Sequence, residues 1–297
     1  MRGQDLNLRP LGYEPNELPG CSTPRLEWRT LSNRSREVKQ ARQGRQIRRG
    51  TVTHVKSRLG GAAGTSAPPT PNAPPSDDEL PEVSAFHRLW YDTRVWERLH
   101  WFGIPIQKNP FDLFQYQEVI CEQRPDFLIE SGALYGGATL FFAQLLELLD
   151  HGRVISIDTN PRWDFRVRDH PRVTTITGSS TDPAILSEIR EIVPGGAHVM
   201  IILDSDHTRD HVLRELEVYS ELLQPGDLLV VEDTNINGHP VLPHHGPGPY
   251  EAVEIFRQGH PEFRLDRQRE GKLLFTSAPR GWLRRHRGAK TDLEIPP

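Results

Sequence analysis

The chain has 297 residues, a formal net charge of -4 and a pI near 6.4, a length that fits one large domain or two ordinary ones. No run approaches the ~20 apolar residues of a membrane span, and the first residues lack the apolar core of a signal peptide. Cys21 and Cys121 make no disulfide framework, so we expect a cytoplasmic protein in which Cys121 is a small buried residue.

The basic residues gather at the start of the chain. Residues 1–60 carry 13 Lys/Arg and 5 Asp/Glu, and the remainder carries 23 and 35. Residues 60–81, GGAAGTSAPPTPNAPPSDDELP, read as a Pro/Ala/Gly-rich linker. We therefore predict a disordered basic arm and linker over 1–83. Within it, the basic stretch REVKQARQGRQIRR (36–49) attracts nucleic acid electrostatically, but it has no interleaved aromatic residues, so we expect neither nucleic acid nor membrane as a partner.

Residues 3–25 have a second interpretation. GQDLNLRPLGYEPNELPGCSTPR resembles a peptide translated from the reverse strand of a transfer RNA gene. On this hypothesis residues 1–25 are a start-site artefact, and the natural start lies downstream.

Helix and strand patterns alternate from residue 84 onward. Apolar residues at helical spacing predict one helix over 85–101, and a second over 111–123 after Pro110. Strands are then predicted at 127–132, 153–160, 172–180, 198–206 and 227–235. Helices are predicted at 136–150, 182–193, 210–223 and 248–259. Two last strands, 263–269 and 272–278, flank a hairpin turn at Glu270-Gly271.

Near-continuous apolar runs such as VMIIL and LLVV are typical of strands covered on both faces. The pattern predicts one α/β domain over 84–283, Rossmann-like, with a mostly parallel, doubly wound sheet and a terminal antiparallel hairpin. Residues 284–297 are expected to form a flexible tail.

Ligands of such sheets lie beyond the carboxyl ends of the strands. After the first strand, Gly132 and the pair Gly136-Gly137 suit either close approach to a ligand or a tight turn. Asp158 at the second strand end suits ribose hydroxyls or a local cap. Ser179 and Ser180, at the end of the third strand, are suited either to contact the edge of an adenine ring or to cap the next helix.

The fourth and fifth strands end in clustered acids. Asp204 follows one strand, and Glu232 and Asp233 follow the next. Converging anions repel unless a cation lies among them, and oxygen ligands suit a hard divalent ion such as Mg²⁺. His207 is a candidate base for a hydroxyl. Its spacing to His211 also suits zinc, although no third His/Cys ligand is evident.

Two loops are candidates for closing the site. Residues 238–249, rich in glycine and proline, are placed like a lid; His244 and His245 there either serve a substrate or lie exposed. Trp101 and residues 104–110 either close over a cofactor or pack against the sheet.

As a set, these motifs resemble the cephalosporin hydroxylase / rhamnosyl O-methyltransferase family, over about residues 90–283. The segments that carry the resemblance are WFGIPIQKNPFDLFQYQEVI, PDFLIESGALYGGAT, VISIDTN, GSSTD, ILDSDHTRDHVLRELEVYSELLQPGDLLVVEDTNING and GPGPYEAVEIF. The resemblance implies a class I methyltransferase that binds S-adenosylmethionine and a divalent metal. It implies a cofactor site at Glu130, Gly132, Tyr135, Gly136, Gly137, Asp158, Ser179 and Ser180. It implies metal ligands at Asp204, Glu232 and Asp233.

One position departs from the family pattern. The chain reads Glu-Ser-Gly-Ala over 130–133 where the family has Glu-Thr-Gly-Thr, so a side-chain bond from Ala133 to the cofactor is lost.

We therefore expect an O-methyltransferase acting on a small-molecule or glycosyl hydroxyl, with a homo-oligomer as one option. In this reading Asp204 and His207 act in catalysis. An iron/2-oxoglutarate hydroxylase and a non-catalytic cofactor-binding protein are the alternatives.

Overall fold

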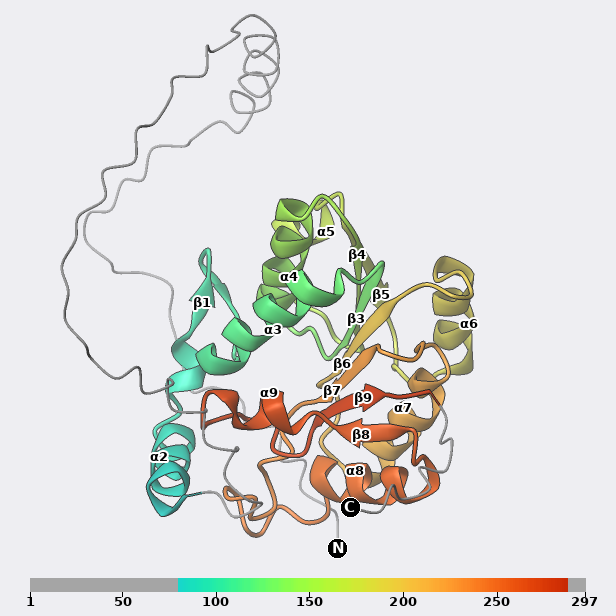
Figure 1. Cartoon of the computed structure of the whole chain (residues 1–297). Coiled ribbons are helices and arrows are strands. Elements are labelled where there is room, and N and C mark those ends of the chain that lie inside the picture. The colour runs from blue at the N-terminus through green and yellow to red at the C-terminus, as the bar shows by residue number, and fades with distance from the viewer. Residues whose placement is uncertain (1–79, 288–297) are drawn as a thin grey trace, which may run out of the picture. The chain divides into compact units, whose positions relative to one another are not determined.

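A seven-stranded sheet forms the centre of the computed structural model, which describes residues 80–287 (Figure 1). The strand order is β5-β4-β3-β6-β7-β9-β8. The strands are β3 (Phe127–Ser131), β4 (Arg153–Asp158), β5 (Val173–Thr177), β6 (Val199–Leu203), β7 (Leu228–Val231), β8 (Phe263–Leu265) and β9 (Trp282–Arg285). Residues 1–79 of the predicted arm and linker and residues 288–297 of the predicted tail lie outside the described residues. The expected end of the linker at residue 83 is wrong, because α2 already begins at Pro81.

The strands β5, β4, β3, β6 and β7 are parallel to one another, and β9 is antiparallel to both β7 and β8. Ser131 pairs with Leu203, and Leu203 pairs with Val231. The ends of β3, β6 and β7 therefore stand side by side at one edge of the sheet. The predicted mostly parallel α/β fold with an antiparallel end is confirmed.

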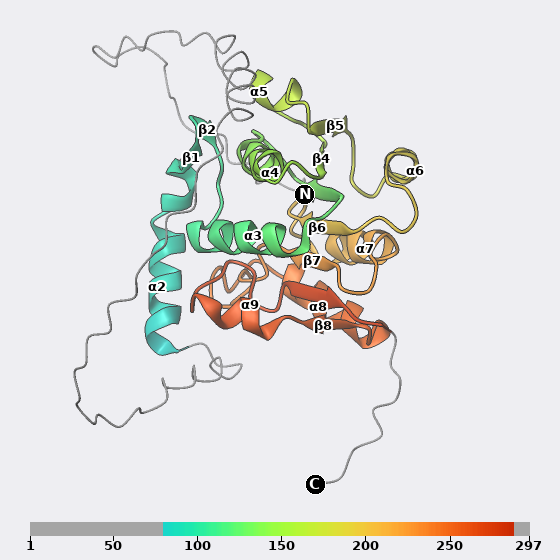
Figure 2. The same ribbon diagram turned by 45° about the horizontal axis from the view of Figure 1, so that its top comes forward.

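Helices cover both faces of the sheet (Figures 1 and 2). The helices of the described residues are α2 (Pro81–Asp92), α3 (Pro110–Gln123), α4 (Gly137–Leu148), α5 (Phe165–Arg168), α6 (Pro183–Ile192), α7 (Arg209–Ser220), α8 (Pro249–Gly259) and α9 (Arg267–Lys272). Successive strand residues point to opposite faces. Leu128 thus joins a core with α3, α4 and α5, and Ile129 joins a second core with α6, α7 and α8. The apolar runs are explained by these two cores.

The predicted single helix over 85–101 is wrong. Helix α2 ends at Asp92, and Arg94 takes the left-handed conformation with φ of 51°. A short 3-10 turn, η3 (Val95–Arg98), follows, and β1 (His100–Trp101) pairs with β2 (Ile104–Pro105). A left-handed residue cannot continue a right-handed helix.

The terminal hairpin forms with a different second strand. Helix α9, capped by the carboxylate of Asp266 on the amide of Arg269, covers the predicted turn at Glu270-Gly271. The strand expected at 272–278 is instead an irregular connection, and β9 runs through Arg285, past the expected domain end at 283. The partner of β8 is therefore β9.

Two smaller expectations concern exposure and membranes. Cys121 is exposed, so the expectation of a small buried residue is wrong. Among residues 80–287, none of the helices has both the length and the apolar character of a membrane span.

Candidate active site

Glycine brings the ends of β3 and β6 into close contact. Gly132 has φ of +83°, and a Cβ built there would stand 1.8 Å from the carbonyl oxygen of Asp204. Any side chain would push Asp204 out of place. The glycine is therefore required by packing between the two strand ends, and this packing fixes the position of the Asp204 backbone.

A cavity of about 420 Å³ opens at this edge of the sheet. Its walls come from the strand ends, from the segment before α3, and from α2 and η3. The lining residues are Trp90, Tyr91, Trp96, Pro105, Ile106, Gln107, Lys108, Asn109, Glu130, Gly132, Ala133, Leu134, Tyr135, Ala138, Asp158, Asp204, Ser205, His207, Glu232, Asp233, Asn235 and Ser277. Its volume is within the range of small-molecule sites.

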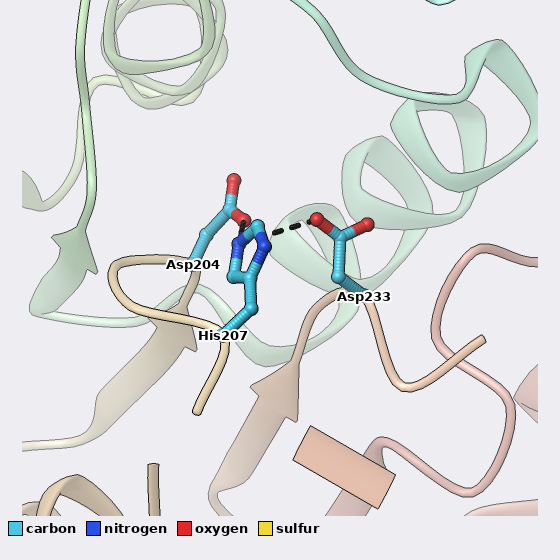
Figure 3. A group of neighbouring side chains, drawn as sticks. All are labelled: Asp204, His207 and Asp233. Atoms are coloured by element: carbon cyan, nitrogen blue, oxygen red, sulfur yellow. Dashed lines mark ion pairs between the residues drawn. The ribbon is translucent and has the colours of Figure 1, made fainter. Parts of the chain in front are cut away.

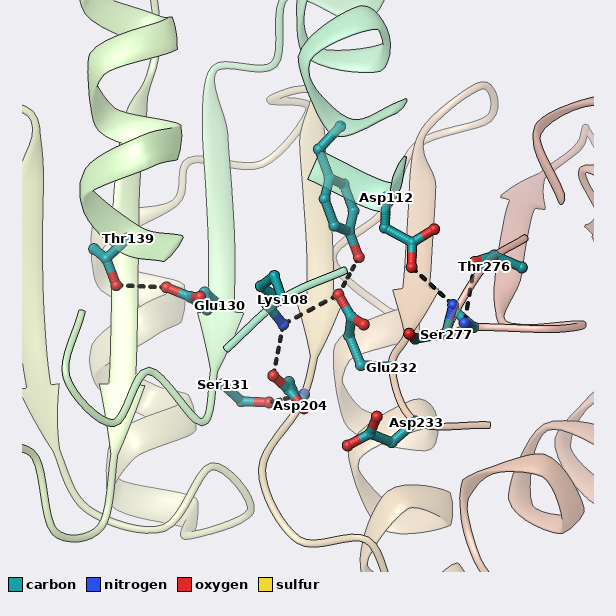
Figure 4. Close-up of polar contacts among 12 residues, drawn as sticks. Lys108, Asp112, Glu130, Ser131, Thr139, Asp204, Glu232, Asp233, Thr276 and Ser277 are labelled. Carbon is teal, nitrogen blue, oxygen red and sulfur yellow. Dashed lines mark hydrogen bonds and ion pairs between the residues drawn. The ribbon is translucent and has the colours of Figure 1, made fainter. Parts of the chain in front are cut away.

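Lys108 lies between two of the predicted acids (Figure 4). Its Nζ is 2.5 Å from Oδ2 of Asp204 and 3.1 Å from Oε1 of Glu232. Burial disfavours the charged lysine, but the two carboxylates hold the pKa of Lys108 above its usual range. Glu232 also accepts a hydrogen bond from the hydroxyl of Tyr116. A protein cation thus neutralises part of the acidic cluster.

His207 lies between Asp204 and the third predicted acid, Asp233 (Figure 3). Its Nε2 is 3.2 Å from Oδ2 of Asp233 and 3.5 Å from Oδ1 of Asp204. Burial lowers the pKa of His207, but the two carboxylates outweigh this and raise it to about 9. Burial raises the pKa of Asp233 to about 6, against the opposing effect of His207. The imidazole is therefore protonated at neutral pH in this arrangement.

The same three residues could hold a metal ion. One ligand atom from each of Asp204, His207 and Asp233 lies within 4.8 Å of the others. Two carboxylates and an imidazole suit Mg²⁺, Mn²⁺ or zinc. Glu232 is turned toward Lys108 and Tyr116, so its role as a metal ligand stays a prediction. The carboxylates of Asp204 and Asp233 fit a divalent ion, which would compete with the positive charge of His207 for them.

Two predicted cofactor acids take different partners. Glu130 is buried and accepts a hydrogen bond from Oγ1 of Thr139 at 2.5 Å; burial raises the pKa of Glu130 to about 7, although Lys108 lowers it. Asp158 accepts from the amides of Leu134 and Asn160, each at 2.7 Å. Each Asp158 oxygen has a second lone-pair direction, so the local cap leaves room for ribose hydroxyls.

The remaining predicted cofactor residues divide into two groups. Tyr135 lines the cavity and its hydroxyl contacts Arg162 at 3.3 Å. Gly136, the left-handed N-cap of α4, and Gly137, which packs on the carbonyl of Pro105, do not line it. The glycine pair therefore serves a tight turn and close packing here.

Ser179 and Ser180 also lie outside this cavity. Ser180 contacts Nε2 of His211 at 3.2 Å, and the ring of His211 lies 3.7 Å from Glu215. His211 is therefore not part of the group that contains His207, and the structure provides no support for a zinc pair at this spacing. The adenine role of the two serines stays a prediction.

Only one of the two segments that were candidates for closing the site lines the cavity. Residues 105–109 line the cavity, whereas Trp101 packs on Phe141 with ring centroids 4.9 Å apart. The 238–249 loop contributes no lining residue, and His244 and His245 are exposed. The lead-in segment thus forms part of the site, and the expected lid does not.

Comparison with known proteins places this chain in a family. Residues 93–286 match the family described as Rhamnosyl O-methyltransferase/CmcI. The chain belongs to the rhamnosyl O-methyltransferase/CmcI family. The predicted membership and enzyme class, an O-methyltransferase, are confirmed.

Relatives of the family are similar over most of their length. Rhamnosyl O-methyltransferase of Mycobacterium tuberculosis H37Rv is 41% identical over 71% of this chain and 87% of its own. The Mycobacterium leprae protein of the same name is 40% identical over 67% of this chain and 88% of its own. A solved CmcI structure with Mg and SAM has a TM-score of 0.51 at 23% identity, covering 64% of this chain and 78% of its own. This last similarity concerns the fold.

Sequence reasoning missed Lys108 and Tyr116. Both lie 96 or more residues before their carboxylate partners, so no local spacing connects them. One signal was present: Lys108 is the single lysine in an apolar, proline-bounded segment that the fold had to bury. A buried lysine needs carboxylates, and the predicted strand ends carry several of them.

Proposed function

We propose that this family member transfers the methyl group of S-adenosylmethionine to a sugar hydroxyl, with help from a divalent ion of the Mg²⁺ type. The observation that carries the proposal is one cavity lined by both Asp158 and the Asp204–Asp233 pair. A ribose-binding acid and a cation-binding pair then face the same space. The name of the mycobacterial relatives supports a glycosyl acceptor.

Different residues of the chain would bind the metal ion and the methyl donor. Asp204 and Asp233 hold the ion, Glu232 is a further predicted ligand, and Asp158 and Tyr135 hold the methyl donor. A bound divalent ion stabilises the negative charge that develops on an acceptor oxygen. The oxygen–carbon bond forms as the carbon–sulfur bond breaks, so alignment of the two substrates in the cavity supplies much of the rate.

His207 is the proposed base for the acceptor proton. It accepts a proton only when neutral, and in this structure Asp204 and Asp233 keep it charged. A cation bound by the same two carboxylates would lower the pKa of His207 toward its ordinary value. The metal and the base are thus coupled through shared carboxylates.

The hydroxylase alternative is less well supported. Iron/2-oxoglutarate enzymes use two histidines and one carboxylate, whereas this group has one histidine and two carboxylates. Nothing in the cavity favours that chemistry over methyl transfer.

Asp204→Asn provides the test. The variant removes a negative charge from the proposed ion site, so metal-dependent methyl transfer to glycoside acceptors should fall at least about a hundredfold. S-adenosylmethionine binding, measured by calorimetry, should change little. Asp206→Asn is the matched control, because Asp206 is exposed and caps the amide of Thr208. Normal turnover by Asp204→Asn would end the metal-site argument.

A further inference from the structure

Helix α7 buries a carboxylate on the face that packs into the core. Val212, Leu216 and Tyr219 form this face, and each is 3% exposed or less. Glu215 lies three residues after Val212 and four before Tyr219, so it shares the face, and its side chain is fully buried. Burying a carboxylate is costly unless polar groups pair with it. Packing of the helix alone does not account for an acid at this position.

The nearest partner of Glu215 is Ser205, in the loop after β6. The hydroxyl of Ser205 donates to Oε1 of Glu215 at 2.8 Å. Nε2 of His211 lies farther away, 3.7 Å from the same oxygen, and contacts Oγ of Ser180 at 3.2 Å. Ser205 lines the cavity, whereas Glu215, His211 and Ser180 do not. The buried acid is therefore connected to the site through one serine hydroxyl.

The loop that contains Ser205 carries two of the three residues of the candidate metal group. Asp204 comes directly before Ser205, and His207 comes two residues after it. The amide of Asp204 donates to the carbonyl of Ser131 at 3.1 Å, which fixes the start of the loop on β3. A Cβ built on Gly132 would stand 2.8 Å from Cα of Ser205. Backbone packing against β3 and the hydroxyl bond to α7 thus act on the same short loop.

A purely structural role would not require these two polar side chains. When both partners of a buried hydrogen bond are replaced by apolar groups of similar shape, stability changes little or rises. Ser205 and Glu215 could therefore be apolar without harm to the fold. What the polar pair adds is direction, because a hydrogen bond to a rigid helix holds the loop in one place.

We propose that Glu215 is a positioning residue for the metal group. Through the Ser205 hydroxyl it holds the loop after β6, and so keeps Asp204 and His207 at the separation from Asp233 that an ion requires. The inference rests on the ion site of the proposed function. Groups that orient metal ligands from outside typically change metal affinity by about 10- to 100-fold.

Calorimetric titration of the full chain with Mg²⁺, without donor or acceptor, tests the proposed role. Ser205→Ala removes the hydroxyl, and Glu215→Met replaces the acid with an apolar side chain of similar length. Each variant should bind Mg²⁺ about tenfold more weakly than the wild type. Glu215→Gln keeps an oxygen that can accept from Ser205, so its Mg²⁺ affinity should stay close to that of the wild type.

Ser220→Ala is the matched control for Ser205→Ala. Ser220 is a buried serine, 6% exposed, whose hydroxyl donates to the carbonyl of Glu217 within α7. It has no contact with the loop after β6 among the described residues. Its loss should leave the Mg²⁺ affinity unchanged.

The double variant Ser205→Ala/Glu215→Met separates positioning from stability. Both partners of the bond are then apolar, so the thermal unfolding midpoint should return toward that of the wild type. Because Glu215 acts through Ser205, the Mg²⁺ affinity should remain as low as in either single variant. Recovery of stability and Mg²⁺ affinity together would show a structural role only and overturn the proposal.

The titration also distinguishes this inference from the proposed function. Wild-type Mg²⁺ affinity in either Ser205→Ala or Glu215→Met overturns the positioning role and leaves the Asp204→Asn test of methyl transfer unaffected. If the wild type binds Mg²⁺ but transfers no methyl group, the proposed function fails, and weaker binding in the two variants still supports the positioning role. A wild type that binds no Mg²⁺ overturns both.

Discussion

Nζ of Lys108 lies 2.5 Å from Oδ2 of Asp204, although the two residues are 96 positions apart in the chain. The other oxygen of Asp204 faces His207 at 3.5 Å. Burial raises the pKa of the Asp204 carboxyl, but the lysine and the histidine outweigh this and hold it below its usual range. Asp204 is therefore an anion held between two cations, one of which a divalent ion can replace.

Replacing Lys108 should destabilise the fold. Lys108→Met leaves Glu232 and one side of Asp204 buried without their cation, which should cost about 3 kcal/mol or more of the free energy of unfolding. Urea unfolding measures this loss. Lys272→Met is the control, because Lys272 is exposed and pairs with Glu118 at the surface. Equal stability of the two variants contradicts the buried ion pair.

Metal binding should release a proton from His207. The pKa of His207 is raised to about 9, so the ring is protonated at pH 7.5. A divalent ion between Asp204 and Asp233 lowers this pKa, and binding should release about one proton. Calorimetry with Mg²⁺ in two buffers of different ionisation enthalpy measures that number. In His207→Asn the release should vanish; its persistence there would assign the proton to another group.

Gly132→Ala should displace Asp204. The new Cβ would meet the Asp204 carbonyl at 1.8 Å and would also force φ of +83° on alanine. Gly196→Ala isolates the second effect, because Gly196 has φ of +88° and open space around it. We expect the control to lose about 1 kcal/mol of stability and Gly132→Ala to lose several times more, together with most methyl-transfer activity. Thermal unfolding and an activity assay compare them.

Asp112 should make stability depend on pH. Burial raises the pKa of Asp112 to about 7, and the nearby Glu232 adds to the shift. Because the folded state binds this proton more tightly than the unfolded state, the contribution is fully present below about pH 4. It is lost as the pH rises to about 7. Asp112→Asn should flatten this part of the stability curve, since an amide oxygen can still accept from the amide of Ser277.

The control for this pH dependence is Asp210→Asn, at an exposed carboxylate beside Arg209. Unfolding free energies measured between pH 4.5 and 8 should keep the wild-type slope in this variant. An unchanged slope in Asp112→Asn as well would remove Asp112 as the cause.

Local sequence patterns predicted the elements that are long and regular. The apolar runs before Asp204 and Glu232 are β6 and β7, which are parallel neighbours as expected. Gly132 was predicted to allow close approach to a ligand or a tight turn; the structure shows a close contact with the backbone of Asp204, and the approach to a ligand stays a prediction. Patterns of this kind are readable because burial on one or two faces imposes a fixed period along the chain.

Short irregular segments were predicted less well. The break after Asp92 depends on one left-handed residue, Arg94. The formation of α9 across the predicted turn depends on a cap from Asp266. Neither feature has a repeating pattern, so periodicity does not predict it. Hydrophobic periodicity therefore predicts the presence of a helix or strand better than it predicts the residue at which that element ends.

The sequence by itself determined a mostly parallel sheet and the convergence of the acids Asp204 and Asp233 at one edge. Only the tertiary structure decided which cation each acid meets: Lys108 for Asp204 and Glu232, and His207 for Asp204 and Asp233. The reason is physical. Periodic burial produces a local pattern in the sequence. The pairing of buried charges depends instead on distances between residues that are far apart in the sequence and close together only in the fold.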